Sequence, residues 1–217
     1  MKRYLLLALC IVLFSQILTA QNLTHGKQYI FPEFMRANVY YKEGSGSKFD
    51  VNYNLLTDEM QYINDKDKKV SFNDFTKIDY IGVGLRHFIP LDYDFAEIVV
   101  DNDNVSLAVK RMTKVSGASR GKINKILDRN EMIPENVELV SDSVYYLIRM
   151  TKPEGVKKGV FKGMALSQDR VVLASYSGFR KVFSKHLDKL NEFIKNESID
   201  LEIPADIVRL INFCNSL

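Results

Sequence analysis

The sequence contains few of the residues on which fibrous or cross-linked proteins depend. Its 217 residues include only two cysteines, five prolines and eleven glycines, and no tryptophan. So little glycine and proline excludes a collagen-like or low-complexity chain, and two cysteines cannot form a disulfide framework at this length. Hydrophobic residues make up 46% of the chain, which excludes a fully disordered protein. The composition therefore predicts a globular protein that is stabilised by packing of a hydrophobic core.

Long apolar runs are absent except near the N-terminus. Residues 4–14 form an unbroken apolar run that follows two basic residues. The run is shorter than the roughly 20 residues that a membrane-spanning helix needs. Its layout is typical of a secretory signal peptide over residues 1–20, with cleavage between Ala20 and Gln21. We therefore expect an exported protein with no transmembrane helix in its mature chain, 21–217.

Cysteine and net charge also bear on the compartment and the partners. Cys10 lies inside the apolar run, so cleavage would leave Cys214 as the remaining cysteine and no internal disulfide. The basic pair before the run supplies two of the three net positive charges of the chain. The mature protein is therefore nearly neutral, and we expect no nucleic-acid partner. The periplasm, the outer membrane and the extracellular medium are the expected locations.

Alternating apolar and polar residues dominate the first half of the mature chain. In residues 48–54, Phe49, Val51 and Tyr53 alternate with acidic and amide residues. Such alternation gives a strand one apolar and one polar face. Short turn-rich clusters separate the runs, a pattern typical of an antiparallel meander. The predicted strands are 39–42, 48–54, 59–63, 69–73, 77–82, 85–89, 95–100, 105–115, 144–150, 160–166 and 171–175.

Helical spacing replaces alternation near the C-terminus. Apolar residues recur on one face of a predicted helix at 179–196, and Pro204 suits the first turn of a second helix at 204–215. Residues 117–136 predict a loop with a short helix at 122–129. The fold class is therefore α+β, a mostly antiparallel meander in the form of a sheet or partly closed barrel, followed by a C-terminal helical pair. We expect one β-rich domain over 21–217.

One pattern is typical of nucleophilic catalysis. Residues 117–121 match the Gly-x-Ser-x-Gly form, with Ser119 at its centre, and an acid (Asp142 or Asp169) and His186 follow in the order of a hydrolase triad. That scaffold requires parallel strands that alternate with helices, whereas this chain predicts antiparallel strands. A flexible Gly/Ser loop is the favoured interpretation. We therefore expect no enzymatic activity and keep a serine hydrolase based on Ser119 as an alternative.

Motifs for metals and cofactors are incomplete. The three histidines have no paired spacing, so a zinc site is not predicted. Residues 101–104 begin like a calcium loop, but Val105 and Met112 occupy ligand positions. The pair Gly82 and Gly84 lacks the third glycine of a dinucleotide-binding loop. We therefore predict neither a metal nor a cofactor.

Charge is distributed unevenly along the chain. An acidic segment at 92–104 has no basic residue, and the segment after it is rich in cations. One interpretation is an anion-binding patch for lipopolysaccharide, phospholipid head groups or an acidic glycan. The other is a solvated segment that the neighbouring acids neutralise. The candidate patch consists of Lys110, Arg111, Lys114, Arg120, Lys122 and Lys125.

Tyrosine occurs eleven times, with adjacent pairs at 40–41 and 145–146. Neighbouring residues of a strand point to opposite faces, so we expect one tyrosine of each pair in the core. The other tyrosine would be exposed, and exposed aromatic residues on a sheet suit contacts with carbohydrate or protein.

Two segments carry a resemblance to a known group. Residues 48–63 and the tail from 181 to 213 resemble uncharacterised exported proteins of Bacteroidota. The resemblance implies an exported Gram-negative protein and no particular activity. In that setting, Asp142-Ser143-Val144 resembles an acceptor for O-glycosylation, although Ser143 also suits the start of a strand.

The function predicted from the sequence is non-catalytic. We expect an envelope-associated exported protein that binds a ligand, a glycan or a protein partner. An accessory subunit of an outer-membrane complex is a further alternative. An envelope protein, a glycan and a lipid are the candidate partners.

Overall fold

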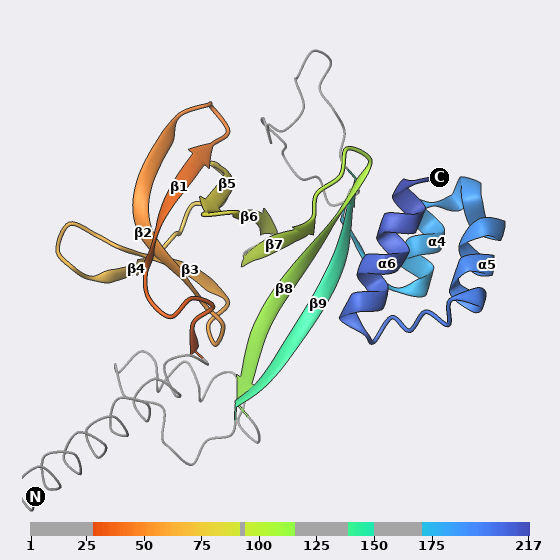
Figure 1. The fold of residues 1–217 in the computed structure, drawn as a ribbon. Coiled ribbons are helices and arrows are strands. Elements are labelled where there is room, and N and C mark those ends of the chain that lie inside the picture. The colour runs from red at the N-terminus through yellow and green to blue at the C-terminus, as the bar shows by residue number, and fades with distance from the viewer. Residues whose placement is uncertain (1–27, 92–93, 116–138, 150–170) are drawn as a thin grey trace, which may run out of the picture. The chain divides into compact units, whose positions relative to one another are not determined.

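The computed structural model describes residues 28–91, 94–115, 139–149 and 171–217 (Figure 1). The chain groups into two compact units. Unit 1 comprises residues up to 35 together with 51–71 and 112–142, and unit 2 comprises 36–50, 72–111 and 143–217. The single domain over 21–217 remains a prediction.

The described strands form a ten-stranded antiparallel sheet that does not close. Its strand order is β10-β9-β8-β7-β6-β5-β1-β2-β3-β4. Two meanders, β1 to β4 and β5 to β10, are joined where β1 pairs with β5. The predicted α+β class with a meander is confirmed. The strands are β1 (Met35–Tyr41), β2 (Gly46–Asn54), β3 (Glu59–Ile63), β4 (Lys69–Ser71), β5 (Ile78–Val83), β6 (Arg86–Leu91), β7 (Asp94–Val100), β8 (Val105–Val115), β9 (Leu139–Arg149) and β10 (Val171–Leu173).

In unit 1, the polar residues at the end of β2 are buried together with the apolar ones. Val51 and Tyr53 are buried, but Asn52 and Asn54 are buried as well. The Asn52 amide accepts a hydrogen bond from the Phe31 backbone N–H and donates to the carbonyl oxygens of Phe31 and Glu33. A buried amide is tolerated because its polar atoms are hydrogen-bonded in this way. The polar face that alternation predicts for residues 48–54 is therefore buried at these two asparagines.

In unit 2, β8 and β9 carry buried apolar residues on both faces of the sheet. On β8, Leu107 belongs to a core cluster that includes the C-terminal helices, and the adjacent Ala108 belongs to a second cluster on the opposite face. On β9, Leu147 and Ile148 are divided between the clusters in the same way. We call the face of Leu107 and Leu147 the helix face and the other the open-sheet face.

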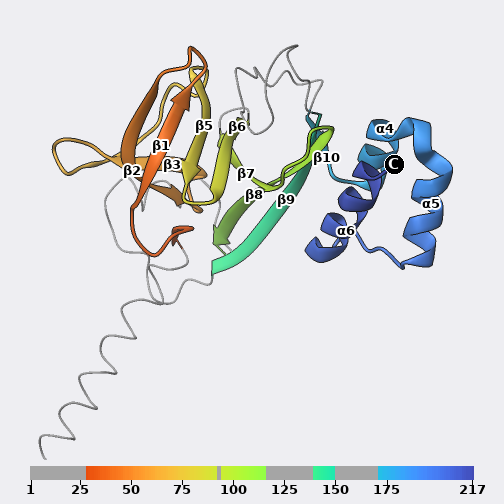
Figure 2. The same cartoon turned by 45° about the horizontal axis from the view of Figure 1, so that its top comes forward.

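Three α-helices follow the sheet: α4 (Tyr176–Val182), α5 (Leu187–Asn196) and α6 (Pro204–Asn215), with a 3₁₀ turn, η2 (Ser184–His186), between the first two. They lie together beside β8 and β9 (Figure 1, Figure 2). The helix predicted at 179–196 is interrupted because Phe183 leaves the helical conformation, with φ −106° and ψ 37°. The helix predicted at 204–215 is present, with proline in its first turn.

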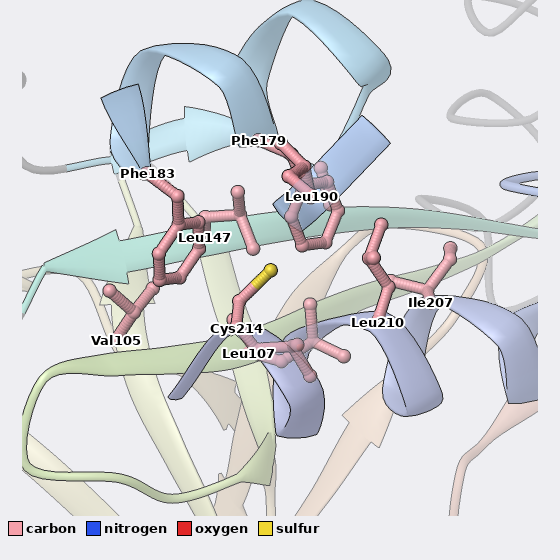
Figure 3. Packing of buried hydrophobic residues seen from close by; sticks show 11 residues of the cluster. Val105, Leu107, Leu147, Phe179, Phe183, Leu190, Ile207, Leu210 and Cys214 are labelled. Carbon is pink, nitrogen blue, oxygen red and sulfur yellow. The ribbon is translucent and has the colours of Figure 1, made fainter. Parts of the chain in front are cut away.

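The helix-face cluster is the core of unit 2 and contains side chains from two strands and three helices. Figure 3 shows Cys214 with its sulfur pointing in among apolar side chains. The buried members are Val105, Leu107, Leu147, Ala174, Phe179, Phe183, Leu190, Ile207, Leu210, Ile211 and Cys214. Burial of this apolar surface holds the helices against the sheet.

Several predicted features lie outside the described residues: the signal peptide with Ala20 and Gln21, the loop at 117–136, the strand at 160–166, and Asp169. Within the described part of the chain, no helix is both long and apolar enough to cross a membrane.

Candidate functional site

The described members of the predicted basic patch are each paired with a carboxylate. Lys110 contacts Asp94, Arg111 contacts Glu97, and Lys114 contacts Asp142. Two of these partners belong to the acidic segment at 92–104. Arg120, Lys122 and Lys125 lie outside the described residues, so the patch as a whole remains a prediction.

Arg86 was not predicted, yet it completes an ion cluster on the helix face of the sheet. Its Nε and Nη2 donate to Oε1 and Oε2 of Glu97 at 2.6 and 2.8 Å. Arg111 donates from Nη1 to the same Oε2. The strand register explains the meeting, because Glu97 on β7 lies opposite Phe88 on β6 and opposite Val109 on β8. We call these three residues the Arg-Glu-Arg cluster.

The Arg-Glu-Arg cluster is partly withdrawn from water. The side chain of Glu97 is 9% exposed, and those of Arg86 and Arg111 are 33% and 34% exposed. Desolvation lowers the pKa of the Arg111 guanidinium, and the nearby charge of Arg86 lowers it further. The Arg86 guanidinium also lies 5.4 Å from the ring centroid of Phe88, at the distance of a cation–π contact. Both cations are thus fixed in place.

A second feature is an aromatic row on the open-sheet face of unit 2. Tyr40 on β1 lies directly opposite Tyr80 on β5, and their rings stack at 4.4 Å between centroids with 18° between planes. His87 on β6 meets the Tyr80 ring edge-on at 5.7 Å. Tyr40 is 39% exposed although it is stacked. The row therefore presents one ordered aromatic ring to solvent.

Two glycines leave space around this row. A side chain at Gly46 on β2 would come within 3.9 Å of the Tyr40 ring, and one at Gly82 on β5 would come within 3.9 Å of Tyr80 and 3.7 Å of His87. Neither glycine has a positive φ, so the backbone does not require them. Their effect is to leave the aromatic rings uncovered at the sides.

Polar side chains border the row on the same face. Arg36 and Asp50 form an exposed ion pair at 3.2 Å between β1 and β2. Asn38 lies between Arg36 and Tyr40 on β1, and Lys48 lies between Gly46 and Asp50 on β2. By alternation both share the face of the ring, and both are exposed. We call Tyr40, Tyr80 and these four polar residues the tyrosine platform.

Burial first, and then the neighbouring Tyr40, raise the pKa of Tyr80 to about 12. The Tyr80 hydroxyl therefore stays protonated well above the ordinary range of tyrosine, and it is neutral at physiological pH. The platform accordingly offers ring surface and hydrogen-bonding groups rather than a phenolate charge.

The tyrosine pairs only partly match expectation. The side chain of Tyr145 packs against the helix-face cluster and that of Tyr146 against the opposite cluster, so their predicted opposite orientation is confirmed. None of the four tyrosines at 40–41 and 145–146 is fully buried, so the prediction of one core member in each pair is wrong. Tyr40 is the exposed member that the sequence predicted.

Two of the groups considered for catalysis, Asp142 and His186, lie within the described residues. His186 ends η2, and Asp142 on β9 pairs with Lys114. Ser119 and Asp169 lie outside the described residues. Burial raises the pKa of the Cys214 thiol to about 12, so it is protonated and unreactive at neutral pH.

Two further features that the sequence singles out, residues 101–104 and Ser143, lie in a turn and on a strand. At residues 101–104 the side chain of Asn102 accepts from the Asn104 backbone N–H, as expected for a polar turn between β7 and β8. Ser143 is exposed within β9. The described residues contain no group of three or more His, Cys, Asp or Glu side chains that could hold a metal ion.

Comparison with known proteins adds no assignment: no family model, no curated protein and no solved structure matches the chain.

Proposed function

We propose that this protein is an exported, envelope-associated, non-catalytic binding protein, and that its ligand is a glycan held on the tyrosine platform. The observation that carries the proposal is the exposed Tyr40 ring, which stacking on Tyr80 holds in one orientation.

A sugar ring offers an apolar face of C–H groups and an edge of hydroxyl groups. An aromatic ring suits the C–H face of the sugar because the ring presents a flat apolar surface with a partial negative charge on its face. Hydrogen-bond donors and acceptors for the hydroxyl edge of the sugar come from the amide of Asn38, the ammonium of Lys48 and the Arg36–Asp50 pair. A few placed polar groups around an aromatic surface are what a specific small-ligand site requires.

Preorganisation favours this surface over other exposed tyrosines. The stack with Tyr80 and the pairing of β1 with β5 already restrict Tyr40 in the free protein. Less side-chain entropy is therefore lost when a ligand binds. Tyr176 on α4 is 44% exposed and serves as the matched comparison, since it lies outside the platform.

The glycan proposal is tested by isothermal titration calorimetry with a panel of soluble neutral and acidic polysaccharides. Tyr40→Ala removes the stacking surface, and we expect a loss of about 1 kcal/mol, roughly fivefold in Kd. Tyr40→Phe retains the ring and should bind as the wild type does. Tyr176→Ala, with similar exposure, should also leave binding unchanged.

Two results contradict the proposal. Equal loss in the Tyr40→Ala and Tyr176→Ala variants places the ligand elsewhere, and a wild-type protein that binds no member of the panel excludes the glycan class. A circular dichroism spectrum of each variant separates loss of binding from loss of fold.

Export is proposed on separate grounds. The basic pair and apolar run before Ala20 support it, as does the resemblance to exported proteins of Bacteroidota. Mass spectrometry of the protein from its native cells should find an N-terminus at Gln21. A retained N-terminus in cytoplasmic fractions would refute export and leave the platform unaffected.

A further inference from the structure

Lys48 has a defined place on the tyrosine platform, between the aromatic ring and the ion pair. Towards one end of β2, Asp50 accepts a hydrogen bond from Nη1 of Arg36 at 3.2 Å. At the other end, a side chain on Gly46 would come within 3.9 Å of the Tyr40 ring. Lys48 is two residues from each of these positions, so it lies midway between them on the same face. Diagonal neighbours on one face of a sheet are about 7–8 Å apart, a distance that a long side chain can span.

The charges on this face of β1 and β2 do not cancel. Its charged side chains are Arg36, Lys48 and Asp50, and Arg36 pairs with Asp50. Lys48 is exposed, and within the described part of the chain it has no carboxylate partner. On the neighbouring strand β5, the residues opposite β1 on this face are Tyr80 and Gly82, which are uncharged. Two cations and one carboxylate therefore leave an excess positive charge beside the exposed ring.

We propose that the glycan held on the tyrosine platform is acidic and that Lys48 binds a carboxylate or sulfate group of its sugar units, an assignment that rests on the proposed function. A sugar stacked on Tyr40 carries its substituents around the edge of the aromatic ring, within reach of the Lys48 ammonium. An ammonium has three N–H donors and no acceptor. Its strongest hydrogen-bond partner is therefore an anionic oxygen, because both groups of such a pair are charged.

The Arg36–Asp50 pair restricts where the acidic group of the glycan can lie. Asp50 is four residues along β2 from Gly46, about 13 Å, so its carboxylate lies at the end of the platform away from the ring. The Asp50 side chain is 48% exposed and repels a second anion. The exposed Asn38 amide, beside Lys48, can donate a further hydrogen bond to an anionic oxygen. The favourable position for the acidic group is therefore near Lys48, next to the stacked sugar.

The test compares polysaccharides that differ in charge alone: polygalacturonate with its carboxyl-reduced form, and dextran sulfate with dextran. Calorimetry at an ionic strength of about 0.15 M screens charges beyond about 8 Å, so cations elsewhere on the surface contribute little. We expect the acidic member of at least one pair to bind about fivefold more tightly than its neutral counterpart. The first pair reports on a carboxylate and the second on a sulfate.

Two outcomes separate this assignment from the proposed function. Equal affinity within both pairs overturns the acidic assignment and leaves a neutral glycan on the platform. No binding of any of the four polysaccharides overturns the acidic assignment and the glycan proposal together.

Variants locate the acidic group. Lys48→Gln removes the charge and keeps N–H donors, and it should weaken binding of the acidic polysaccharide about fivefold. Lys48→Arg keeps the charge and should bind as the wild type does. Lys189→Gln is the matched control, since Lys189 is an exposed lysine on α5, outside the platform, and its loss should leave the affinity unchanged. Wild-type affinity in Lys48→Gln, or an equal loss in Lys189→Gln, overturns the assignment.

Discussion

Replacement of Gly178 by alanine offers the sharpest test of how α4 packs. Gly178 is buried in the middle of α4, and its backbone N–H donates to the Ser175 side chain that caps the helix, at 3.2 Å. In an unobstructed helix, glycine to alanine stabilises by about 0.5–1 kcal/mol, because alanine has the higher helix propensity. This structure predicts the opposite sign.

The reason is the close approach of β10 to the helix. A methyl group on Gly178 would lie 1.9 Å from the carbonyl oxygen of Leu173 and 3.1 Å from a methyl carbon of Val172. The first contact involves backbone, which cannot rotate away, so either β10 or α4 must shift. Overpacking of this kind costs about 1–3 kcal/mol and at times more. We expect a net loss of about 2 kcal/mol after the gain in helix propensity.

Thermal and urea unfolding measure the loss. For a chain of this size, a loss of that magnitude lowers Tm by about 4–8 °C. Labelling of the Cys214 thiol gives a second, local readout, since the thiol reacts only when the helices open. A fall of about 2 kcal/mol in the opening free energy speeds labelling about 30-fold when reclosing is fast.

Gly46→Ala is the matched control, because its nearest contact would be 3.5 Å, an ordinary van der Waals distance. We expect a change within about 0.5 kcal/mol for that variant. A Gly178→Ala protein that is as stable as the wild type, or more stable, would refute the close packing of β10 on α4.

Three further predictions follow from the same structure. Ser175→Ala removes the N-cap of α4 and should cost about 1 kcal/mol in urea unfolding; an unchanged midpoint would contradict the cap. Leu190→Ala empties a fully buried position of the helix-face cluster and should cost about 2–5 kcal/mol, whereas Lys189→Ala on the exposed side should cost less than about 0.5 kcal/mol. The pKa of Tyr80 in the folded protein is raised to about 12. The stability that the protonated Tyr80 hydroxyl contributes is therefore complete below the unfolded pKa of 10.0 and is lost as pH rises toward 12. Tyr40→Ala should lower that pKa in an ultraviolet titration, and an unchanged value would contradict the stack.

Local pattern was sufficient to locate most strands of the described residues and the helix at 204–215. Alternation identified β2 and β8 because each is long enough to show its period. The open form of the sheet and the pairing of β1 with β5 could not be predicted, since both depend on contacts between residues distant in sequence. The break at Phe183 was also missed, because the apolar stripe continues through it.

The candidate sites were predicted less completely than the fold, for a related reason. Arg111 was identified as a cation, but its partners Glu97 and Arg86 come from two other strands. These three side chains meet because of the registers of β6, β7 and β8. The charges of the residues alone do not specify a strand register. Opposite charges at 97 and 111, in strands joined by a short turn, were the available signal. Tyr40 was singled out as half of a pair, but its stacking partner Tyr80 was not.

The hydrogen bond from the Asn215 side chain to the Val105 carbonyl oxygen, 2.9 Å long, has a consequence for biosynthesis. It joins residues 110 positions apart, and the apolar side chains of α6 cover the same end of β8. A ribosome makes β8 and β9 well before α6, so Leu107 and Leu147 lack this cover until the last residues of the chain are made. A nascent chain whose core is completed so late stays accessible to chaperones until its synthesis ends, a property that suits the export we propose.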